Sequence, residues 1–212
     1  MARKHTPRHA GSVVILEHVS RVLKGNRLDD PHVRKLVVWL PPGYDGSGHR
    51  RFPALYDFAG FTGSGLAHLN WKPFSENLVE RVARLVHERK MPPMILVMPD
   101  CYTALGGNQY LNSSAIGRYA DYLTREIVPF VDAEFRTLAA REHRGCFGKS
   151  SGGYGALVHG MKYPATWGAI ADHSGDAYFD FLYRSDWPNT LNELAKYRQP
   201  PRRAGVYRSM RP

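Results

Sequence analysis

The sequence predicts an α/β fold with a mostly parallel sheet and helices on both faces. Short apolar runs alternate along the chain with segments in which apolar residues repeat at helical spacing. The run Met94–Met98 is continuously apolar, which is typical of a strand buried on both faces. Strands that alternate with helices indicate a sheet built from parallel crossover units.

Six strands are expected, and each is an apolar run bounded by turn residues. They span Ser12–Val19, Val33–Leu40, Phe52–Phe58, Met94–Met98, Arg144–Phe147 and Trp167–Ala171. Only a short spacer joins the first two strands, so we expect them to pair antiparallel at one edge of the sheet.

Three helices are expected from stripes of apolar residues. The stripes lie within residues 78–86, 119–130 and 154–161, and Pro129 comes near the end of the second. The third stripe directly follows a glycine-rich turn, so this turn joins a predicted strand to a predicted helix.

Composition and charge limit the possible function classes. The chain has 212 residues, of which 43% are hydrophobic and 23% charged, which favours one globular domain over a disordered or fibrous chain. Residues 1–10 carry +3 and residues 182–212 carry +5, so two units of the net charge of +10 remain for residues 11–181. A nucleic-acid domain needs a basic stripe on its folded surface, so no nucleic-acid partner is expected. A basic-tailed binding protein is the minor alternative.

The predicted domain organisation has three parts. They are a basic N-terminal extension (residues 1–11), one α/β domain (12–197) and a basic tail without apolar periodicity (198–212), which we expect to be disordered. No run approaches the roughly 20 apolar residues of a membrane span, and the N-terminus lacks the apolar stretch of a secretory signal. Two cysteines, Cys101 and Cys146, are too few for a disulfide framework. A soluble cytoplasmic protein is therefore expected, with its oligomeric state open.

The motif Gly148-x-Ser150-x-Gly152 marks the candidate nucleophile. In a nucleophile elbow the serine occupies a strained strand-to-helix turn, and its neighbours must be small because the two backbones nearly touch. Ser151 does not fit that role, because Lys149 would be one of its flanking residues. A phosphate-binding loop would need glycine where His143 stands. A plain glycine-rich turn without chemistry is the remaining alternative.

An acyl-transfer serine also needs donors for the oxyanion. These are usually the N–H after the serine and an N–H from the loop after the third strand. Here they would be the backbone N–H groups of Ser151 and Phe61, the latter in the loop Ala59–Gly63. A glycine-rich loop of this kind can equally be a turn without function.

Several segments together resemble the putative esterase family of α/β-hydrolases, which includes esterase D, enterochelin esterase and the mycolyltransferases. The segments are Leu40–Asp45 (LPPGYD), Phe52–Gly60 (FPALYDFAG), Met94–Asp100 (MILVMPD), Tyr122–Asp132 (YLTREIVPFVD) and Gly148–Ala156 (GKSSGGYGA). The resemblance covers about residues 12–183. It implies hydrolysis or transfer of an acyl ester through a seryl-acyl intermediate, with Ser150 as nucleophile and Phe61 and Ser151 forming the oxyanion hole. Ala59 stands where the family commonly has histidine, which leaves the backbone donors unaffected.

The rest of the catalytic triad is not evident. In this fold the acid and the histidine follow the serine, after a seventh and an eighth strand, yet 62 residues follow Ser150 and six strands can be placed. We therefore expect a domain truncated after about the sixth strand, in which the ancestral esterase activity could be lost. The alternative function is a non-catalytic fragment or pseudoenzyme that keeps the elbow without the triad.

Other polar residues receive non-catalytic predictions. His159 lies roughly 13 Å along the helix from Ser150, too far to act as its base. His173 and Asp176 are expected at the pocket rim. His173 as general base, with Asp176 as its acid, is the minor alternative, because in the triad of this fold the acid precedes the histidine. Asp100 is expected to hold its own loop, and Cys101 to be a small packed residue. Trp71 and Tyr110 fit either an apolar pocket or the core. No cluster has metal-ligand spacing, so no metal or other cofactor is expected, and the expected partner is a small-molecule ester.

Overall fold

The structure, a computed structural model, describes residues 11–197, which divide after Gly175 into two compact units. The expected N-terminal extension, apart from Gly11, and the expected tail at 198–212 lie outside the described residues.

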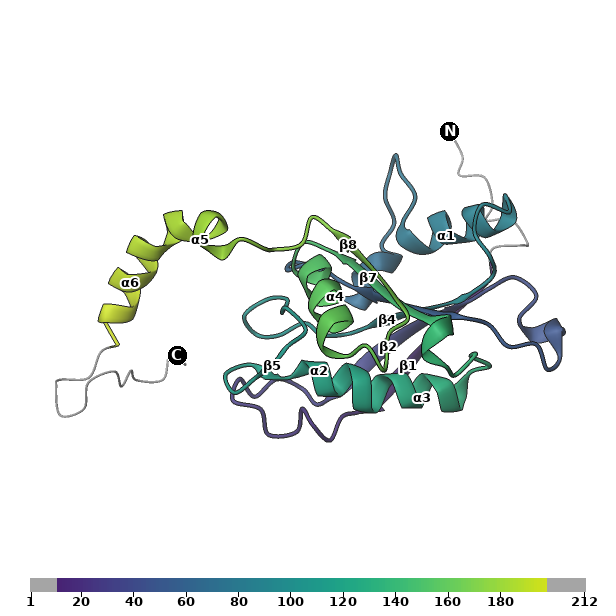
Figure 1. Ribbon diagram of the computed structural model, residues 1–212, viewed down its shortest axis with the longest axis horizontal. Coiled ribbons are helices and arrows are strands. Elements are labelled where there is room, and N and C mark those ends of the chain that lie inside the picture. The colour runs from purple at the N-terminus through teal and green to yellow at the C-terminus, as the bar shows by residue number, and fades with distance from the viewer. Residues whose placement is uncertain (1–10, 198–212) are drawn as a thin grey trace. The chain divides into compact units, whose positions relative to one another are not determined.

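The first unit is built around a six-stranded sheet (Figure 1). Its strand order is β1-β2-β4-β3-β7-β8. The strands are β1 (Ser12–Val19), β2 (Val33–Leu40), β3 (Ala54–Phe58), β4 (Ile95–Pro99), β7 (Arg144–Lys149) and β8 (Ala169–His173). All six predicted strands are therefore confirmed, with shifts of one or two residues at some ends.

The strand directions also agree with the prediction. β1 pairs antiparallel with β2, and β2 pairs antiparallel with β4, whereas β4, β3, β7 and β8 run parallel. The strand that leads to Ser150, β7, lies between β3 and β8. The carboxyl ends of these three strands therefore meet at one edge, where ligands of open parallel sheets bind.

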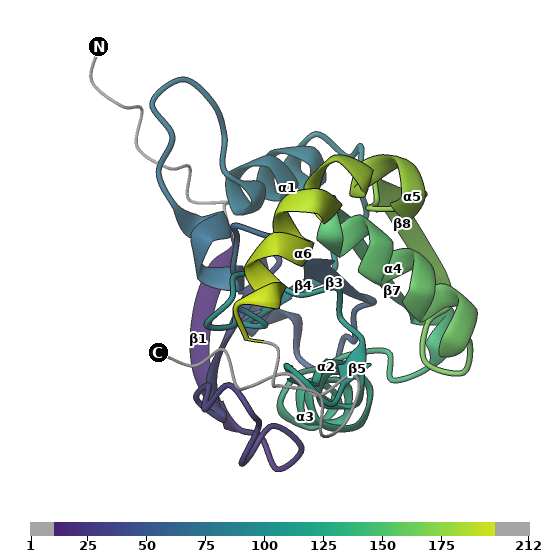
Figure 2. The same cartoon turned by 90° about the vertical axis from the view of Figure 1, so that its left-hand side faces the viewer.

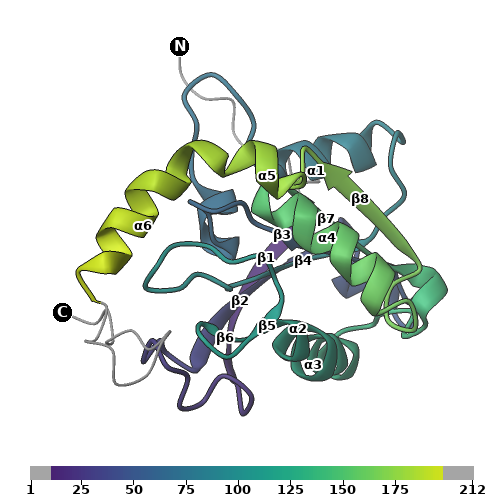
Figure 3. The ribbon, with the colours of Figure 1, turned by 60° about the vertical axis from the view of Figure 1, so that its left-hand side comes forward.

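Helices cover both faces of the sheet. Helix α1 (Leu78–His87) packs on one face, against a cluster that includes Trp39 and Met98. Helices α2 (Tyr119–Asp121), α3 (Val128–Glu134) and α4 (Ser151–Lys162) lie on the other face, against the larger cluster around Tyr56 and Phe58. Figure 2 shows α1 and α3 on opposite sides of the strands, and Figure 3 shows α4 running along β7 and β8. The mostly parallel α/β architecture is thus confirmed.

The second predicted helix differs in its interior. A π-helical segment, η3 (Tyr122–Ile127), separates α2 from α3, and Pro129 occupies the first turn of α3. Proline cannot donate to the carbonyl four residues earlier, so a regular α-helix is interrupted here. Shorter elements complete the unit: the 3₁₀ turns η1 (Asp45–Ser47), η2 (Gly65–Leu69) and η4 (Arg141–His143) and the two-residue strands β5 (Asn112–Ser113) and β6 (Gly117–Arg118).

The second unit is helical. It contains α5 (Phe179–Leu182), η5 (Arg184–Asp186) and α6 (Trp187–Ala195), for which the sequence analysis predicted no helix. Within this unit the Tyr178 and Phe181 rings stack with their centroids 5.8 Å apart.

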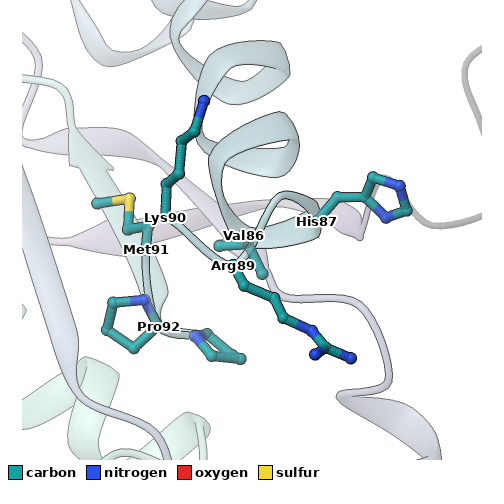
Figure 4. A pocket seen from close by; sticks show the side chains of 7 residues that line it. Val86, His87, Arg89, Lys90, Met91 and Pro92 are labelled. Carbon is teal, nitrogen blue, oxygen red and sulfur yellow. The ribbon is translucent and has the colours of Figure 1, made fainter.

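The end of α1 is closed by a Schellman motif. The Lys90 N–H donates to the Leu85 carbonyl oxygen (2.9 Å) and the Arg89 N–H donates to that of Val86 (3.1 Å). Arg89 consequently has a left-handed backbone (φ +57°), a conformation that favours glycine. A cavity of about 540 Å³ lies beside this turn, but Figure 4 shows the Arg89 and Lys90 side chains pointing in different directions, so their charges do not converge.

We expect Arg89→Gly to stabilise the protein by about 0.5–1 kcal/mol. Relief of the left-handed conformation at this exposed position outweighs the larger unfolded-state entropy of glycine. Urea denaturation measures the change. Arg81→Gly, in the interior of the same helix, is the matched control and should cost about 1 kcal/mol. A loss of stability in both variants would contradict the prediction.

Candidate functional site

Ser150 lies in the turn between β7 and α4, with a strained backbone. Its φ of +58° and ψ of −124° fall outside the regions that non-glycine residues normally occupy. Two hydrogen bonds hold this conformation. The Ser150 N–H donates to the His173 carbonyl oxygen (3.0 Å), and the Ser150 carbonyl oxygen accepts from the Tyr154 N–H (3.0 Å).

The residues flanking Ser150 have no room for a side chain. A β-carbon at Gly152 would lie 1.8 Å from the Phe58 carbonyl oxygen. One at Gly148 would lie 2.4 Å from the Gly152 carbonyl carbon and 2.5 Å from the same Phe58 oxygen. The ends of β3 and β7 and the first turn of α4 are therefore in backbone contact, which confirms that these two flanking positions must be small.

The loop after β3 passes directly beside this turn. A β-carbon at Gly60 would lie 3.3 Å from the Lys149 carbonyl oxygen and 3.8 Å from Ser150 Cβ. The Gly60 carbonyl oxygen accepts from the Gly63 N–H (2.9 Å). Because N–H and C=O point in opposite directions in a trans peptide, the Phe61 N–H points away from the Gly63 N–H and out of the Gly60–Gly63 turn. Within residues 11–197 no backbone group accepts a hydrogen bond from it.

Ser151 is the first residue of α4 and is almost fully buried. The first N–H groups of a helix and its dipole favour negative charge near its N-terminus. The structure therefore brings together Ser150, the start of α4 and the Gly60–Phe61 peptide. This arrangement can stabilise the oxyanion of a tetrahedral intermediate.

His159 lies on α4, and its side chain is fully buried. Its Nδ1 accepts from Trp167 Nε1 (3.1 Å), and its Nε2 lies 2.8 Å from the Tyr110 carbonyl oxygen. Burial lowers the pKa of His159 to about 4, despite the opposing effect of the hydrogen bond to Tyr110. With both ring nitrogens occupied, this imidazole cannot take a proton from Ser150.

The two residues predicted at the pocket rim fall in different units. His173 is the last residue of β8, pairs with Lys149 and has an exposed side chain, while its carbonyl oxygen anchors Ser150. Asp176 begins the second unit, so its position relative to Ser150 is not described.

The remaining polar predictions concern the loop after β4. Asp100 Oδ1 accepts from the Tyr102 N–H (3.0 Å), so Asp100 holds its own loop as predicted. Cys101 is buried, and burial raises the pKa of its thiol. Tyr110 belongs to the core, whereas Trp71 is exposed.

A buried carboxylate–imidazole pair lies at the loop after β3 and was not predicted. Asp57 Oδ2 contacts His68 Nδ1, which joins β3 to η2 at either end of the loop that carries Phe61. Burial raises the pKa of Asp57, whereas the Asp57 contact outweighs burial and raises the pKa of His68. The pair therefore keeps its shared proton to a higher pH than isolated side chains would. One signal was available: Asp57 is an acid within an otherwise apolar strand.

The family follows from comparison with known proteins. The model of the family described as "Putative esterase" matches residues 30–182. The chain belongs to this family. Esterase Rv1288 of Mycobacterium tuberculosis is 32% identical over 160 residues, which make up 72% of this chain and 32% of that protein. The chain thus spans about a third of the length of this relative.

Solved structures with the same fold are esterases and other serine hydrolases. The feruloyl esterase module from Clostridium thermocellum matches with a TM-score of 0.62 at 18% identity, covering 88% of this chain and 64% of the module. FphF, a fluorophosphonate-binding serine hydrolase of Staphylococcus aureus, has a TM-score of 0.62 at 17% identity, covering 81% and 60%. The α/β-hydrolase fold is thereby confirmed, and the chain spans somewhat less than two thirds of each structure.

No group of three or more histidine, cysteine, aspartate or glutamate residues within residues 11–197 could hold a metal ion. No helix in this part of the chain is both long and apolar enough to cross a membrane.

Proposed function

We propose that this chain hydrolyses carboxylic esters of small molecules through a seryl-acyl intermediate on Ser150. The observation that carries the proposal is the strained Ser150 backbone at the β7–α4 turn, packed through Gly148 and Gly152 against the end of β3. A strained backbone at this position is typical of a nucleophile elbow. Family membership supports the same ester chemistry.

In the proposed reaction Ser150 Oγ attacks the ester carbonyl carbon. The carbonyl oxygen becomes negatively charged and accepts hydrogen bonds from the backbone N–H groups of Phe61 and Ser151, aided by the N-terminus of α4. Collapse of this intermediate breaks the bond to the alcohol oxygen, which takes up the proton lost by Ser150 Oγ, so the alcohol leaves and the acyl group stays on Ser150. Water then attacks the acyl carbonyl, which releases the carboxylic acid and returns a proton to Ser150 Oγ. His173, at the end of β8, is assigned to substrate contact at the rim.

Hydrolysis of p-nitrophenyl acetate by the purified 212-residue chain tests the proposal. Ser150→Ala should lower kcat by roughly three orders of magnitude or more, because it removes the nucleophile. The control is Ser12→Ala, an exposed serine at the start of β1, which should keep full activity. Brief reaction with the ester should also add one acetyl group to the peptide that contains Ser150.

Either result is informative. Ser150-dependent hydrolysis would establish a working site, and His173→Ala would then test the one other histidine that follows Ser150 as the proton acceptor. Equal rates for the wild-type chain and Ser150→Ala, in folded protein, would contradict the proposal. The chain would then carry a nucleophile elbow without turnover.

A further inference from the structure

The loop Ala59–Gly63, which carries the proposed donor Phe61, is the proposed oxyanion loop. Three of its consecutive peptides are each held by a hydrogen bond to their carbonyl oxygen. The Ala59 oxygen accepts from the Tyr110 hydroxyl (2.5 Å), the Gly60 oxygen from the Gly63 N–H (2.9 Å) and the Phe61 oxygen from the Gly107 N–H (2.6 Å). Two of these three donors come from one segment, residues 107–110, which follows β4.

The two outside contacts matter because the loop's own hydrogen bond, from the Gly63 N–H to the Gly60 oxygen, holds only one of the three peptides. The close approach to Lys149 and Ser150 leaves little space for a side chain at Gly60, and glycine has the widest choice of backbone angles. The peptide between Gly60 and Phe61 carries the proposed oxyanion donor. Its direction depends on where the neighbouring peptides are anchored.

Tyr110 is built into the fold as a rigid anchor. Its backbone is left-handed (φ +61°), which is a strained conformation for a bulky residue, and its side chain is buried. Its N–H donates to Asn108 Oδ1 (2.6 Å), and its ring stacks on Phe58 with the centroids 4.5 Å apart. A β-carbon at Gly155 would lie 2.5 Å from the ring, so α4 is also in close contact with it.

The carbonyl group of Tyr110 is anchored by a histidine whose tautomer follows from its partners. Trp167 Nε1 can only donate, so His159 Nδ1 must accept and the ring proton must be on Nε2. The His159 Nε2–H therefore donates to the Tyr110 carbonyl oxygen (2.8 Å). Every polar group of Tyr110 thus has a partner, and together they over-determine its strained backbone.

We propose that Tyr110 is a positioning residue for the oxyanion loop: its hydroxyl fixes the Ala59–Gly60 peptide and thereby the direction of the Phe61 N–H. His159, on α4, and Trp167, in the segment after α4, hold Tyr110 in place. The positioning itself is a property of the folded chain. Its consequence for catalysis rests on the proposed function.

The test removes a single oxygen atom. Tyr110→Phe keeps the ring that stacks on Phe58 and deletes the donor to Ala59. Amide hydrogen exchange at Gly63 and Gly107, the donors to the next two loop carbonyls, should become about fivefold to tenfold faster. Exchange at Val38, in the buried strand β2, should change less than twofold. Tyr102 is an exposed tyrosine in the same segment after β4, so Tyr102→Phe is the matched control. It should change the exchange rate neither at Gly63 and Gly107 nor at Val38.

A kinetic measurement accompanies the exchange measurement. If the chain shows Ser150-dependent hydrolysis, Tyr110→Phe should lower kcat about tenfold with little change in KM, because an oxyanion donor acts in the transition state. Tyr102→Phe should not alter kcat. If the chain hydrolyses no ester, the proposed function fails while hydrogen exchange still decides the positioning role. Unchanged exchange at Gly63 and Gly107, or an equal acceleration at Val38, would overturn the proposal.

Discussion

Replacement of Gly152 by alanine should destabilise the protein by about 3 kcal/mol or more, and the variant is expected to accumulate as unfolded protein. The added β-carbon would lie 1.8 Å from the Phe58 carbonyl oxygen and 2.9 Å from that of Ala59. Backbone atoms form both obstacles, so no side chain can rotate out of the way. Relief requires α4 to move away from β3, which would separate the elbow from the oxyanion loop.

The control for this prediction is another glycine-to-alanine change. A β-carbon at Gly46, in the turn η1, meets no atom within 4 Å, and the backbone there is not left-handed. Gly46→Ala should therefore be neutral or stabilising by up to about 1 kcal/mol, because alanine has less unfolded-state entropy. Guanidinium denaturation followed by circular dichroism measures both variants. Equal stability of Gly152→Ala and Gly46→Ala would contradict the prediction that a β-carbon at Gly152 meets the Phe58 carbonyl oxygen.

The second large effect is a dependence of stability on pH that comes from His159. Burial lowers the pKa of this histidine from 6.5 to about 4 in the folded state. Between these two values the unfolded chain binds a proton that the folded chain does not. Stability from this residue is therefore fully present above about pH 6.5 and falls by about 3 kcal/mol as the pH drops to 4. Protonation of Nδ1 would also break the hydrogen bond from Trp167.

His159→Gln isolates this effect. Glutamine can still donate to Tyr110 and accept from Trp167, but it does not titrate. The free energy of unfolding, measured by urea denaturation between pH 4 and 7, should vary by about 3 kcal/mol less in this variant than in the wild-type chain. His143→Gln replaces an exposed histidine and should leave the wild-type dependence largely unchanged. The prediction fails if the free energy of unfolding changes with pH by the same amount in His159→Gln and in the wild-type chain.

Local patterns in the sequence were sufficient for most of the fold. The apolar runs predicted all six strands of the main sheet. The inner strands β3 and β4 are buried on both faces and therefore have few polar residues. The capping box of Asn77 and Glu80, in which each side chain accepts from the other's backbone N–H, begins α1 where the apolar stripe begins. The π-helical turn before Pro129 was not predicted, because an apolar stripe does not distinguish hydrogen bonds to the fourth residue from those to the fifth.

The candidate site was predicted only in part. Ser150 and its two glycines form a local motif, so the sequence pointed to them directly. Tyr110 was left between pocket and core, and the Asp57–His68 pair was missed. Their roles depend on contacts between segments far apart in the chain, such as the 51 residues that separate Tyr110 from Ala59.

The sequence by itself thus determined the alternation of strands and helices, the membership in an ester-hydrolysing family and the position of the candidate nucleophile. These features are encoded by neighbouring residues: apolar periodicity, a turn rich in glycine and a series of short motifs. Only the tertiary structure decided that Gly152 packs onto the carbonyl of Phe58, that His159 is buried with a lowered pKa, and that the Tyr110 hydroxyl donates to the Ala59 carbonyl oxygen. Each of these depends on how β3, α4 and the segment after β4 pack together, and packing between distant segments leaves no local pattern in the sequence.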